Sequence, residues 1–337
     1  MKKNLSKLAE VRKQKKAKEE KIHIISSLKE ALAEIERLET EVGAIKVLRR
    51  AQRVTEIKPR VGESKSEATA FAIATDWHVG CRIKREQVNF LNEYDMAIAR
   101  KRIVRFFEGV VTLTNKERQN VSISELVLFL GGDLIDGALH LDTIMSNEIA
   151  EPVEQAVQVQ ALIEAGLNFL LNHGGFKRIT VVCADGNHGR ITHKMHWNSR
   201  QGNSLEWYMY YNVAQRFQIP ELSWQMVHGI HEYVKVYDKL VRFHHGDTIG
   251  FGGINGPYTF LNRKIGEWDK AIQADFSVQG HLHSYIPGSR RWLINGSLIG
   301  YSPYAQALGG ENNPPIQAFF LIDKKRGLTV QIPILVG

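Results

Sequence analysis

Cysteine is scarce in this sequence. The chain of 337 residues holds two, Cys81 and Cys183, and neither belongs to a CxxC pair. Two thiols are too few to staple a secreted fold of this size or to build a zinc knuckle. There is also no run of about 18 apolar residues, and the start, MKKNLSKLAEVRKQKK, never reaches the apolar stretch of a secretory signal. We therefore expect reduced thiols, no membrane association and a cytoplasmic location.

Compositional extremes are missing as well. Hydrophobic residues make up 43% of the chain, charged residues 24% and aromatic residues 9%, which excludes disordered, collagen-like and membrane classes. The length allows one large domain or two ordinary ones, each with a real core. A folded, water-soluble protein is the expectation.

The positive charge is concentrated at the start of the chain. The formal net charge is +8, and residues 1–21 alone contribute +6, because they hold nine basic and three acidic residues. A basic arm attracts polyanions such as nucleic acid through counterion release. It also suits a solvated tail that aids solubility. Both interpretations stay open.

Residues 1–56 are predicted to form this arm as a helix, because residues 2–53 contain no Pro and a single Gly. Apolar residues step by three and four, as in a coiled-coil seam, before the register shifts: Ile25, Leu28, Leu32 and Ile35. A short coiled coil that joins copies of the chain and a helix folded back onto its own domain fit equally well.

The rest of the chain is predicted to be a linker and one α/β domain. Residues 57–68 combine Pro, Gly, Ser and charge, and the domain covers residues 69–337. Strands are expected at 69–75, 125–130, 178–184, 232–243, 275–280, 290–295, 317–322 and 328–332, and helices near 92–118, 148–172, 203–217 and 257–272. This alternation indicates a central sheet with outer helices, and the late strands indicate a second, mixed sheet.

Polar clusters follow five of these expected strands. They read DWH at 76–78, GGD at 131–133, GNH at 186–188, HHG at 244–246 and GHLH at 280–283. Strand ends converge on one crevice in open α/β architectures, so the clusters are candidates for a single site. Extended chain would point Asp76 and His78 to one side, and likewise His281 and His283. Carboxylates, a carboxamide and imidazoles in this number suit two divalent ions.

The ordered set D-x-H, GD, GNH, HG and GHxH resembles the motifs of the calcineurin-like metallophosphoesterases over residues 69 to about 300. Within that family, the sequences DWHVG and GHLH are most similar to the SbcD-type DNA repair nuclease branch. The resemblance implies a two-sheet αββα sandwich and two divalent metal ions, with Mn²⁺ expected and Fe, Zn, Ni or Mg as alternatives. It implies one metal on Asp76, His78, Asp133 and His283, and a second on Asp133, Asn187, His245 and His281. A metal-bridging hydroxide would be the nucleophile.

The resemblance also implies that His188 is the catalytic acid, because an imidazolium can protonate a departing alkoxide near neutral pH. The family often has an acidic residue after GNH, whereas Gly189 and Arg190 follow here. Another group must therefore orient His188, and Arg190 is a candidate for gripping a phosphate oxygen. His244, next to His245, is expected to face away from the site.

Charge counting favours an anionic substrate. Two divalent ions, the carboxylates of Asp76 and Asp133 and one hydroxide leave a formal charge of +1, which suits a phosphate group. Phosphoester hydrolysis is therefore the expected reaction. DNA is the expected substrate, cut by an exonuclease or endonuclease, because the motif wording and the basic arm agree. Alternatives are a phosphodiesterase or phosphatase for nucleotides or other small phosphoesters, and a non-catalytic scaffold with a vestigial metal site.

A second candidate for DNA contact is residues 190–200, RITHKMHWNSR, in which cations accompany Trp197. Such a mixture suits phosphates and stacked bases. An ordinary polar loop explains the same residues equally well.

Overall fold

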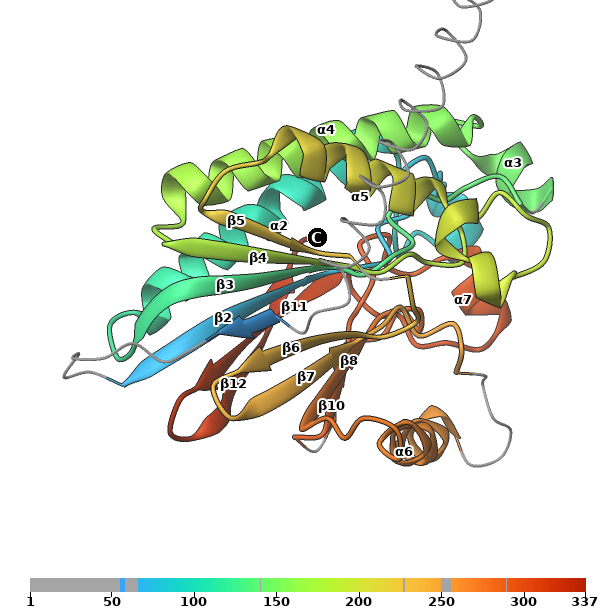
Figure 1. The fold of residues 1–337 in the computed structure, drawn as a ribbon. Coiled ribbons are helices and arrows are strands. Elements are labelled where there is room, and N and C mark those ends of the chain that lie inside the picture. Colours follow the sequence, from blue (N-terminus) through green and yellow to red (C-terminus); the bar gives the residue numbers. More distant parts are fainter. Residues whose placement is uncertain (1–54, 58–65, 140, 227, 250–255, 289) are drawn as a thin grey trace, which may run out of the picture. The chain divides into compact units, whose positions relative to one another are not determined.

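The computed structural model describes residues 55–57, 66–139, 141–226, 228–249, 256–288 and 290–337 (Figure 1). The chain divides into two units, Met1–Arg53 and Val54–Gly337. The predicted helical arm, apart from Thr55 and Glu56, lies outside the described residues, as does most of the predicted linker. The fold below is that of the second unit.

The first sheet has six strands in the order β12-β11-β2-β3-β4-β5. Its members are β2 (Glu67–Ala74), β3 (Ser122–Leu130), β4 (Arg178–Cys183), β5 (Leu222–Gln225), β11 (Ile316–Asp323) and β12 (Gly327–Leu335). Strands β2 to β5 are parallel, and β11 and β12 are antiparallel to their neighbours. All of β2 is buried, as is usual for a parallel strand covered on both faces.

The second sheet also has six strands, in the order β1-β6-β7-β8-β10-β9. They are β1 (Thr55–Ile57), β6 (Glu232–Val236), β7 (Lys239–Phe243), β8 (Phe276–Gln279), β9 (Ile286–Gly288) and β10 (Trp292–Ile294). Tyr237, with φ of 57°, turns the chain between β6 and β7, so the single strand expected at 232–243 is an antiparallel hairpin. The predicted mixed sheet is confirmed.

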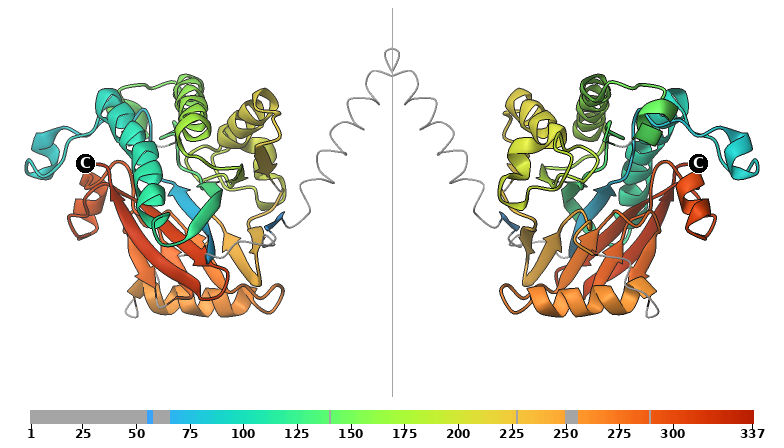
Figure 2. Two further views of the ribbon diagram at one scale, coloured as in Figure 1. Left: turned by 90° about the vertical axis from the view of Figure 1, so that its left-hand side faces the viewer. Right: turned by 90° about the vertical axis from the view of Figure 1, so that its right-hand side faces the viewer.

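Helices cover the outer faces of the two sheets. In Figures 1 and 2, α2 (Met96–Glu117), α4 (Pro152–His173) and α5 (Leu205–Arg216) lie over the first sheet, and α6 (Gly256–Trp268) lies against the second. Shorter helical elements are α3 (Leu141–Ser146), α7 (Pro303–Ala307), η1 (Arg85–Val88), η2 (Trp197–Ser199) and η3 (Gln201–Asn203). The layers confirm the αββα sandwich, and no described helix has the length and apolar content of a membrane span.

An apolar layer holds the two sheets together. Phe71 of β2 stacks on Phe320 of β11, with ring centroids 4.4 Å apart. Phe129 of β3 packs against Phe243 of β7 at 4.9 Å, which joins one sheet to the other. Because these rings are fully buried, the sheets cannot slide without opening the core. This packing fixes the strand ends that carry the polar motifs.

One strand of each sheet includes residues that the sequence assigns to the arm or the linker. Strand β1 pairs in parallel with β6, although its three residues span the boundary between the expected arm and the expected linker. Strand β2 begins at Glu67, two residues before the predicted start of the domain. Edges of this kind are set by pairing with distant strands, which local composition does not reveal.

Candidate metal centre

The five polar motifs meet where strands of both sheets end. Three groups of side chains have ligand atoms that lie within 4.8 Å of one another: Asp76, His78 and His283; Asp133, His245 and His281; and His78, Asp133 and His188. The first two groups correspond to the two ligand sets implied by the resemblance, and Asn187 joins the second. The sequence motifs therefore converge on one site, as expected.

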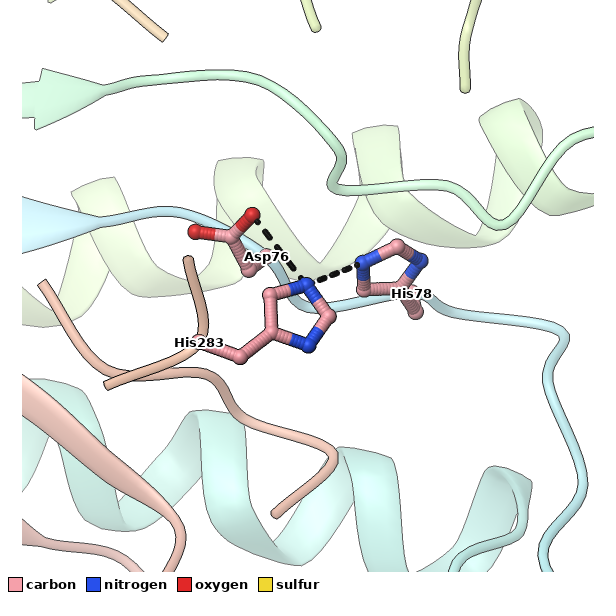
Figure 3. Close-up of side chains that lie close together, drawn as sticks. All are labelled: Asp76, His78 and His283. Atoms are coloured by element: carbon pink, nitrogen blue, oxygen red, sulfur yellow. Dashed lines mark hydrogen bonds and ion pairs between the residues drawn. The ribbon is translucent and has the colours of Figure 1, made fainter. Parts of the chain in front are cut away.

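The first group is shown in Figure 3. The Nε2 atoms of His78 and His283 lie 3.1 Å apart. The Nε2 atom of His283 is also 3.5 Å from Oδ1 of Asp76, whose side chain is fully buried. Two imidazole nitrogens and a carboxylate oxygen thus point toward a common position, as ligands of a divalent ion do.

The second group centres on His245. Its Nε2 atom lies 3.0 Å from Oδ2 of Asp133 and 3.2 Å from Oδ1 of Asn187. The ring of His281 is 5.2 Å from that of His245, centroid to centroid. Since Asp133 also belongs to the group with His78, its carboxylate lies between the two ligand sets. A carboxylate in that place can bridge two metal ions.

Backbone conformation presents these ligands in an unexpected way. Asp76, His78, Asp133, His281 and His283 all have left-handed φ values, between 49° and 68°. The extended-chain explanation for Asp76 with His78, and for His281 with His283, is therefore wrong. Strands β2 and β8 end before these residues, and left-handed turns direct the side chains instead. Such backbone costs on the order of 1–3 kcal/mol per non-glycine residue and clusters at functional sites.

Glycines let the loops after β3 and β4 touch. A Cβ atom on Gly132 would collide with the backbone of Gly186, and one on Gly186 would collide with the carboxylate of Asp133. Gly132 also has a φ of 86°, which favours glycine. The close approach lets the backbone N–H of His188 donate to Oδ1 of Asp133, at 2.8 Å. The glycines of GGD and GNH thus allow the close approach of the two loops that holds the Asp133 carboxylate in place.

Polar partners behind the ligands orient the imidazole rings. Nδ1 of His78 lies 2.9 Å from Oδ1 of Asp136, and Nδ1 of His245 lies 2.8 Å from the carbonyl oxygen of Gly131. With Nδ1 engaged, Nε2 is the nitrogen directed to the site, which is the arrangement typical of metal-binding histidines. Asp136 was not among the residues predicted from the motifs, although a carboxylate three residues after Asp133 was a visible signal. These buried, convergent donors fit two divalent ions.

His188 lies at the edge of the site and is 23% exposed. Its Nδ1 atom is 2.8 Å from the backbone oxygen of Asp136, and its ring is 4.6 Å from that of His78. Burial by itself would lower the pKa of His188, but the carboxylates of Asp133 and Asp136 outweigh it, so the pKa is raised above its ordinary value. The protonated form of the imidazole is therefore favoured at the edge of the site.

A buried carboxylate from a helix also belongs to the site. Glu206, on α5, accepts hydrogen bonds from the backbone N–H groups of Leu134 at 2.5 Å, Gly186 at 2.7 Å and Asp133 at 3.2 Å. Burial and the charge of Asp133 raise the pKa of Glu206 to about 7. The motifs gave no signal for this residue, because it lies on an amphipathic helix with no polar cluster around it.

Arg190 lies in the loop after His188. Its guanidinium donates to the backbone oxygens of Asn187, Thr192 and His193. Arg190 therefore shapes the loop that carries Asn187. The direct contact with a phosphate oxygen that the sequence suggested for Arg190 stays a prediction.

Arg200, at the end of the same loop, contacts two carboxylates. Its Nε donates to Asp185 at 2.9 Å, and its Nη1 donates to Asp247 at 2.8 Å. Asp185 follows β4 and Asp247 follows His245, so the buried arginine ties together the two loops that supply Asn187 and His245. By contrast, Lys194 and Trp197 in this segment are exposed.

His244 turns away from the candidate metal ligands, as expected. Its ring packs against Trp268 and His231, with centroids 4.8 Å and 5.4 Å away. Burial, with the nearby charges of His231 and Arg242, keeps the pKa of His244 well below its ordinary value. Among the described residues, His244 takes part in none of the metal-ligand groups.

No protein-family model matches the chain, and none of the curated proteins does. Solved structures similar to it include a conserved uncharacterized protein, a predicted phosphoesterase, from Streptococcus pneumoniae TIGR4, at 12% identity and TM-score 0.30, covering 79% of this chain and 98% of that one. Vps29 from Chaetomium thermophilum matches at 10% identity and TM-score 0.32, covering 80% and 100%. A dimetal phosphatase from Danio rerio matches at 11% and 0.37, covering 80% and 99%. TM-scores this low decide neither fold nor function, which rest on this chain's own geometry.

Proposed function

We propose that this protein is a metallophosphoesterase that hydrolyses phosphoesters with two divalent metal ions. The observation that carries the proposal is the pair of ligand groups joined at Asp133, one with Asp76, His78 and His283 and the other with His245 and His281. All of these side chains come from loops that follow strands, in the order of the motifs. Mn²⁺ is the metal we propose.

When bound, two divalent ions would neutralise phosphate oxygens and supply an activated hydroxide for in-line attack on phosphorus. Asp133 holds the middle of the site, and His78 and His245 are held by their Nδ1 contacts. His188 donates a proton to the leaving oxygen as its bond to phosphorus breaks. We assign that proton to Nε2, because Nδ1 lies 2.8 Å from the backbone oxygen of Asp136.

The charges found around the site keep the argument for an anionic substrate. Asp136 adds a negative charge, because its contact with His78 outweighs its burial and keeps its pKa below the ordinary value. The raised pKa of His188 favours its protonated form, whose positive charge would offset that of Asp136. With both metals, Asp76, Asp133 and one hydroxide, the formal surplus is +1 while Glu206, whose pKa is about 7, is protonated. A phosphodiester, which carries a single negative charge, matches it.

DNA is the substrate that we propose within this class, cut by a nuclease. Trp197 is 51% exposed on the loop that follows His188, and its neighbours Lys194 and His196 are exposed as well. An exposed indole beside cations can stack on a base while the cations contact phosphates. The basic arm supplies further positive charge.

A small phosphoester, such as a nucleotide, is the second candidate. It is favoured by one observation, namely that Arg200 is buried between two carboxylates and Arg190 is engaged with backbone oxygens. Both arginines of the 190–200 loop are thus used within the protein, which leaves fewer cations for a long polyanion.

The experiment compares substrates on the full chain loaded with Mn²⁺. Linear duplex, single-stranded DNA and bis(p-nitrophenyl) phosphate are incubated with the wild type and with Asp133→Asn, which removes a charged ligand. We expect chelator-sensitive hydrolysis by the wild type and loss of about 100-fold or more in the variant. A wild type that binds Mn²⁺ but hydrolyses none of the substrates would overturn the proposed function and favour a non-catalytic scaffold.

Removal of residues 1–53 tests the proposed partners. If the arm binds DNA, the truncated protein shows a flatter dependence of DNA affinity on salt, because fewer phosphates are neutralised. If the arm joins copies of the chain, the truncated protein becomes a monomer and its DNA affinity stays the same. Light scattering and fluorescence anisotropy across salt concentrations measure both.

A further inference from the structure

Gly189 leaves a space that Glu206 fills. A Cβ atom at position 189 would lie 2.5 Å from Cγ, 3.0 Å from Cδ and 3.1 Å from Oε2 of Glu206. Gly189 does not have a left-handed φ, so its backbone does not require glycine. The missing side chain is therefore a matter of space, and the space is taken by a carboxylate from another element.

The carboxylate of Glu206 connects two loops of the metal centre. Its Oε2 accepts from Gly186 N at 2.7 Å and from Asp133 N at 3.2 Å, and its Oε1 accepts from Leu134 N at 2.5 Å. Asp133 belongs to the loop after β3, and Gly186 directly precedes Asn187 in the loop after β4. One side chain thus sets the separation between the shared carboxylate and the amide ligand.

Helix α5 is held in place for this task. The backbone N–H of Leu205, the first residue of α5, donates to the oxygen of Gly189 at 2.8 Å. The Oγ atom of Ser204 accepts from the N–H of Trp207 and caps the helix. Glu206 therefore projects from a fixed first turn. The hydrogen bond between Leu205 and Gly189 holds positions 189 and 206 next to each other.

We propose that Glu206 is a positioning residue of the metal centre, and that the same role can be served by an acidic side chain at position 189, which the space now taken by Glu206 would admit. The inference rests on the proposed function, because it concerns how the two metals are held. Glu206 contacts backbone N–H groups and acts through Asp133, so it positions a ligand and is not a catalytic residue.

Removal of the carboxylate has a specific consequence. Glu206→Ala leaves the N–H groups of Asp133, Leu134 and Gly186 without this acceptor, and the two loops lose their common anchor. Partners behind metal ligands typically change metal affinity by about 10–100-fold. We expect that loss for Mn²⁺, with a fall in kcat and little change in KM, because the substrate itself is not contacted.

The test exchanges the two positions. Glu206→Ala, Glu206→Gln and the double variant Gly189→Asp with Glu206→Ala are compared with the wild type in the full chain. In the double variant the aspartate carboxyl carbon lies one bond beyond the Cβ position, in the space that Cγ and Cδ of Glu206 occupy in the wild type. We expect it to regain most of the Mn²⁺ affinity, measured by calorimetry, and the spin-coupled two-manganese signal, measured by electron paramagnetic resonance. Glu206→Gln retains one acceptor oxygen and should fall between.

A matched control separates positioning from simple stability. Asp323 is a buried carboxylate that accepts from Lys325 N at 2.8 Å and from Arg326 N at 2.9 Å. It pairs with Ala68 near the start of β2, whereas Asp76 follows the other end of that strand. Asp323→Ala should lower the melting temperature and leave Mn²⁺ affinity unchanged.

Two results would overturn the proposal. The first is a folded Glu206→Ala, or Glu206→Gln if the alanine variant does not fold, that binds two Mn²⁺ ions as tightly as the wild type. The second is a folded double variant that is no better than Glu206→Ala. Mn²⁺ binding is measured directly, so the two proposals can fail separately. A wild type that binds both ions and turns over no phosphoester overturns the proposed function. The Mn²⁺ affinities of the Glu206 variants and of the double variant still decide the role of Glu206.

Discussion

Nδ1 of His78 lies 2.9 Å from Oδ1 of Asp136, and both side chains are at least 95% shielded from solvent. Asp136 fixes the rotation of the imidazole and holds the proton on Nδ1, which leaves Nε2 for the metal. The carbonyl oxygen of Asp136 also lies 2.8 Å from Nδ1 of His188. One residue therefore orients a proposed ligand and the proposed acid.

Asp136→Asn should weaken binding of the metal held by His78 by about 10–100-fold, because the amide cannot compensate the charge on the imidazole as a carboxylate does. Calorimetric titration with Mn²⁺ measures the change. Asp238→Asn, at a carboxylate that is 69% exposed, is the control and should not alter binding. Equal affinity in the two variants would contradict the assignment.

His188→Ala should slow substrates with alkoxide leaving groups by about 100-fold or more, because general-acid catalysis contributes factors of that size. A nitrophenolate leaves without a proton, so bis(p-nitrophenyl) phosphate should be affected much less. Steady-state rates on both kinds of ester give the comparison. If the two slow down equally, His188 is not the acid.

Asn187→Asp should retain metal but reduce turnover of phosphodiesters by roughly tenfold, since the added charge cancels the formal surplus of the site. Asn187 Oδ1 lies 3.2 Å from Nε2 of His245, so a carboxylate in its place still reaches the second ligand group. The value of kcat/KM is the quantity to measure, and Asn120→Asp on the exposed surface is the control. Unchanged turnover would count against the charge argument.

Metal binding should release a proton at neutral pH. Burial alone would lower the pKa of His245, but the charge of Asp133 outweighs it and raises that pKa to about 10, so the metal-free side chain is protonated. Burial, together with the charge of His245, lowers the pKa of His281 to about 4, so His281 is already neutral. A metal ligand must be deprotonated, so His245 gives up about one proton.

The sign of the pH dependence follows from that proton. Affinity for the second metal should rise about tenfold for each pH unit between pH 7 and 9, below the raised pKa of His245. Titration with Mn²⁺ in buffers of different ionisation enthalpy counts the protons released. A count of zero would show that the pair of His245 and Asp133 does not hold a proton in the metal-free protein.

Arg200→Met should destabilise the metal-free domain by about 3–5 kcal/mol, because it leaves two buried carboxylates without their cation. The side chains of Arg200 and Asp185 are 4% exposed, and that of Asp247 is 7% exposed. Arg216→Ala breaks an ion pair whose arginine is 62% exposed, and should cost less than about 1 kcal/mol. Urea unfolding measures both, and similar values would refute the difference.

The sequence, with the family resemblance that its motifs carry, was enough to name the candidate residues of the site. Each strand that ends at the site is followed by its chemistry-bearing residues, so the order of the motifs is visible in the linear chain. Asp76, His78, Asp133, Asn187, His188, His245, His281 and His283 could therefore be named, and the structure brings them together. The pattern of strands and helices indicated an α/β domain with a second, mixed sheet, and the family resemblance implied the αββα sandwich.

Tertiary structure decided how those ligands are held. Asp76 and His78 are presented by left-handed turns, which the alternating pattern of a strand does not encode. Glu206 and Arg200 act on loops that are distant in sequence, through hydrogen bonds that form only when α5 and the loop after β7 pack against the loop after β4. Local sequence patterns indicate which residues are buried and how motif residues are spaced, whereas contacts between distant segments depend on how the elements pack. The physical chemistry of the ligands was thus readable in advance, and their support was not.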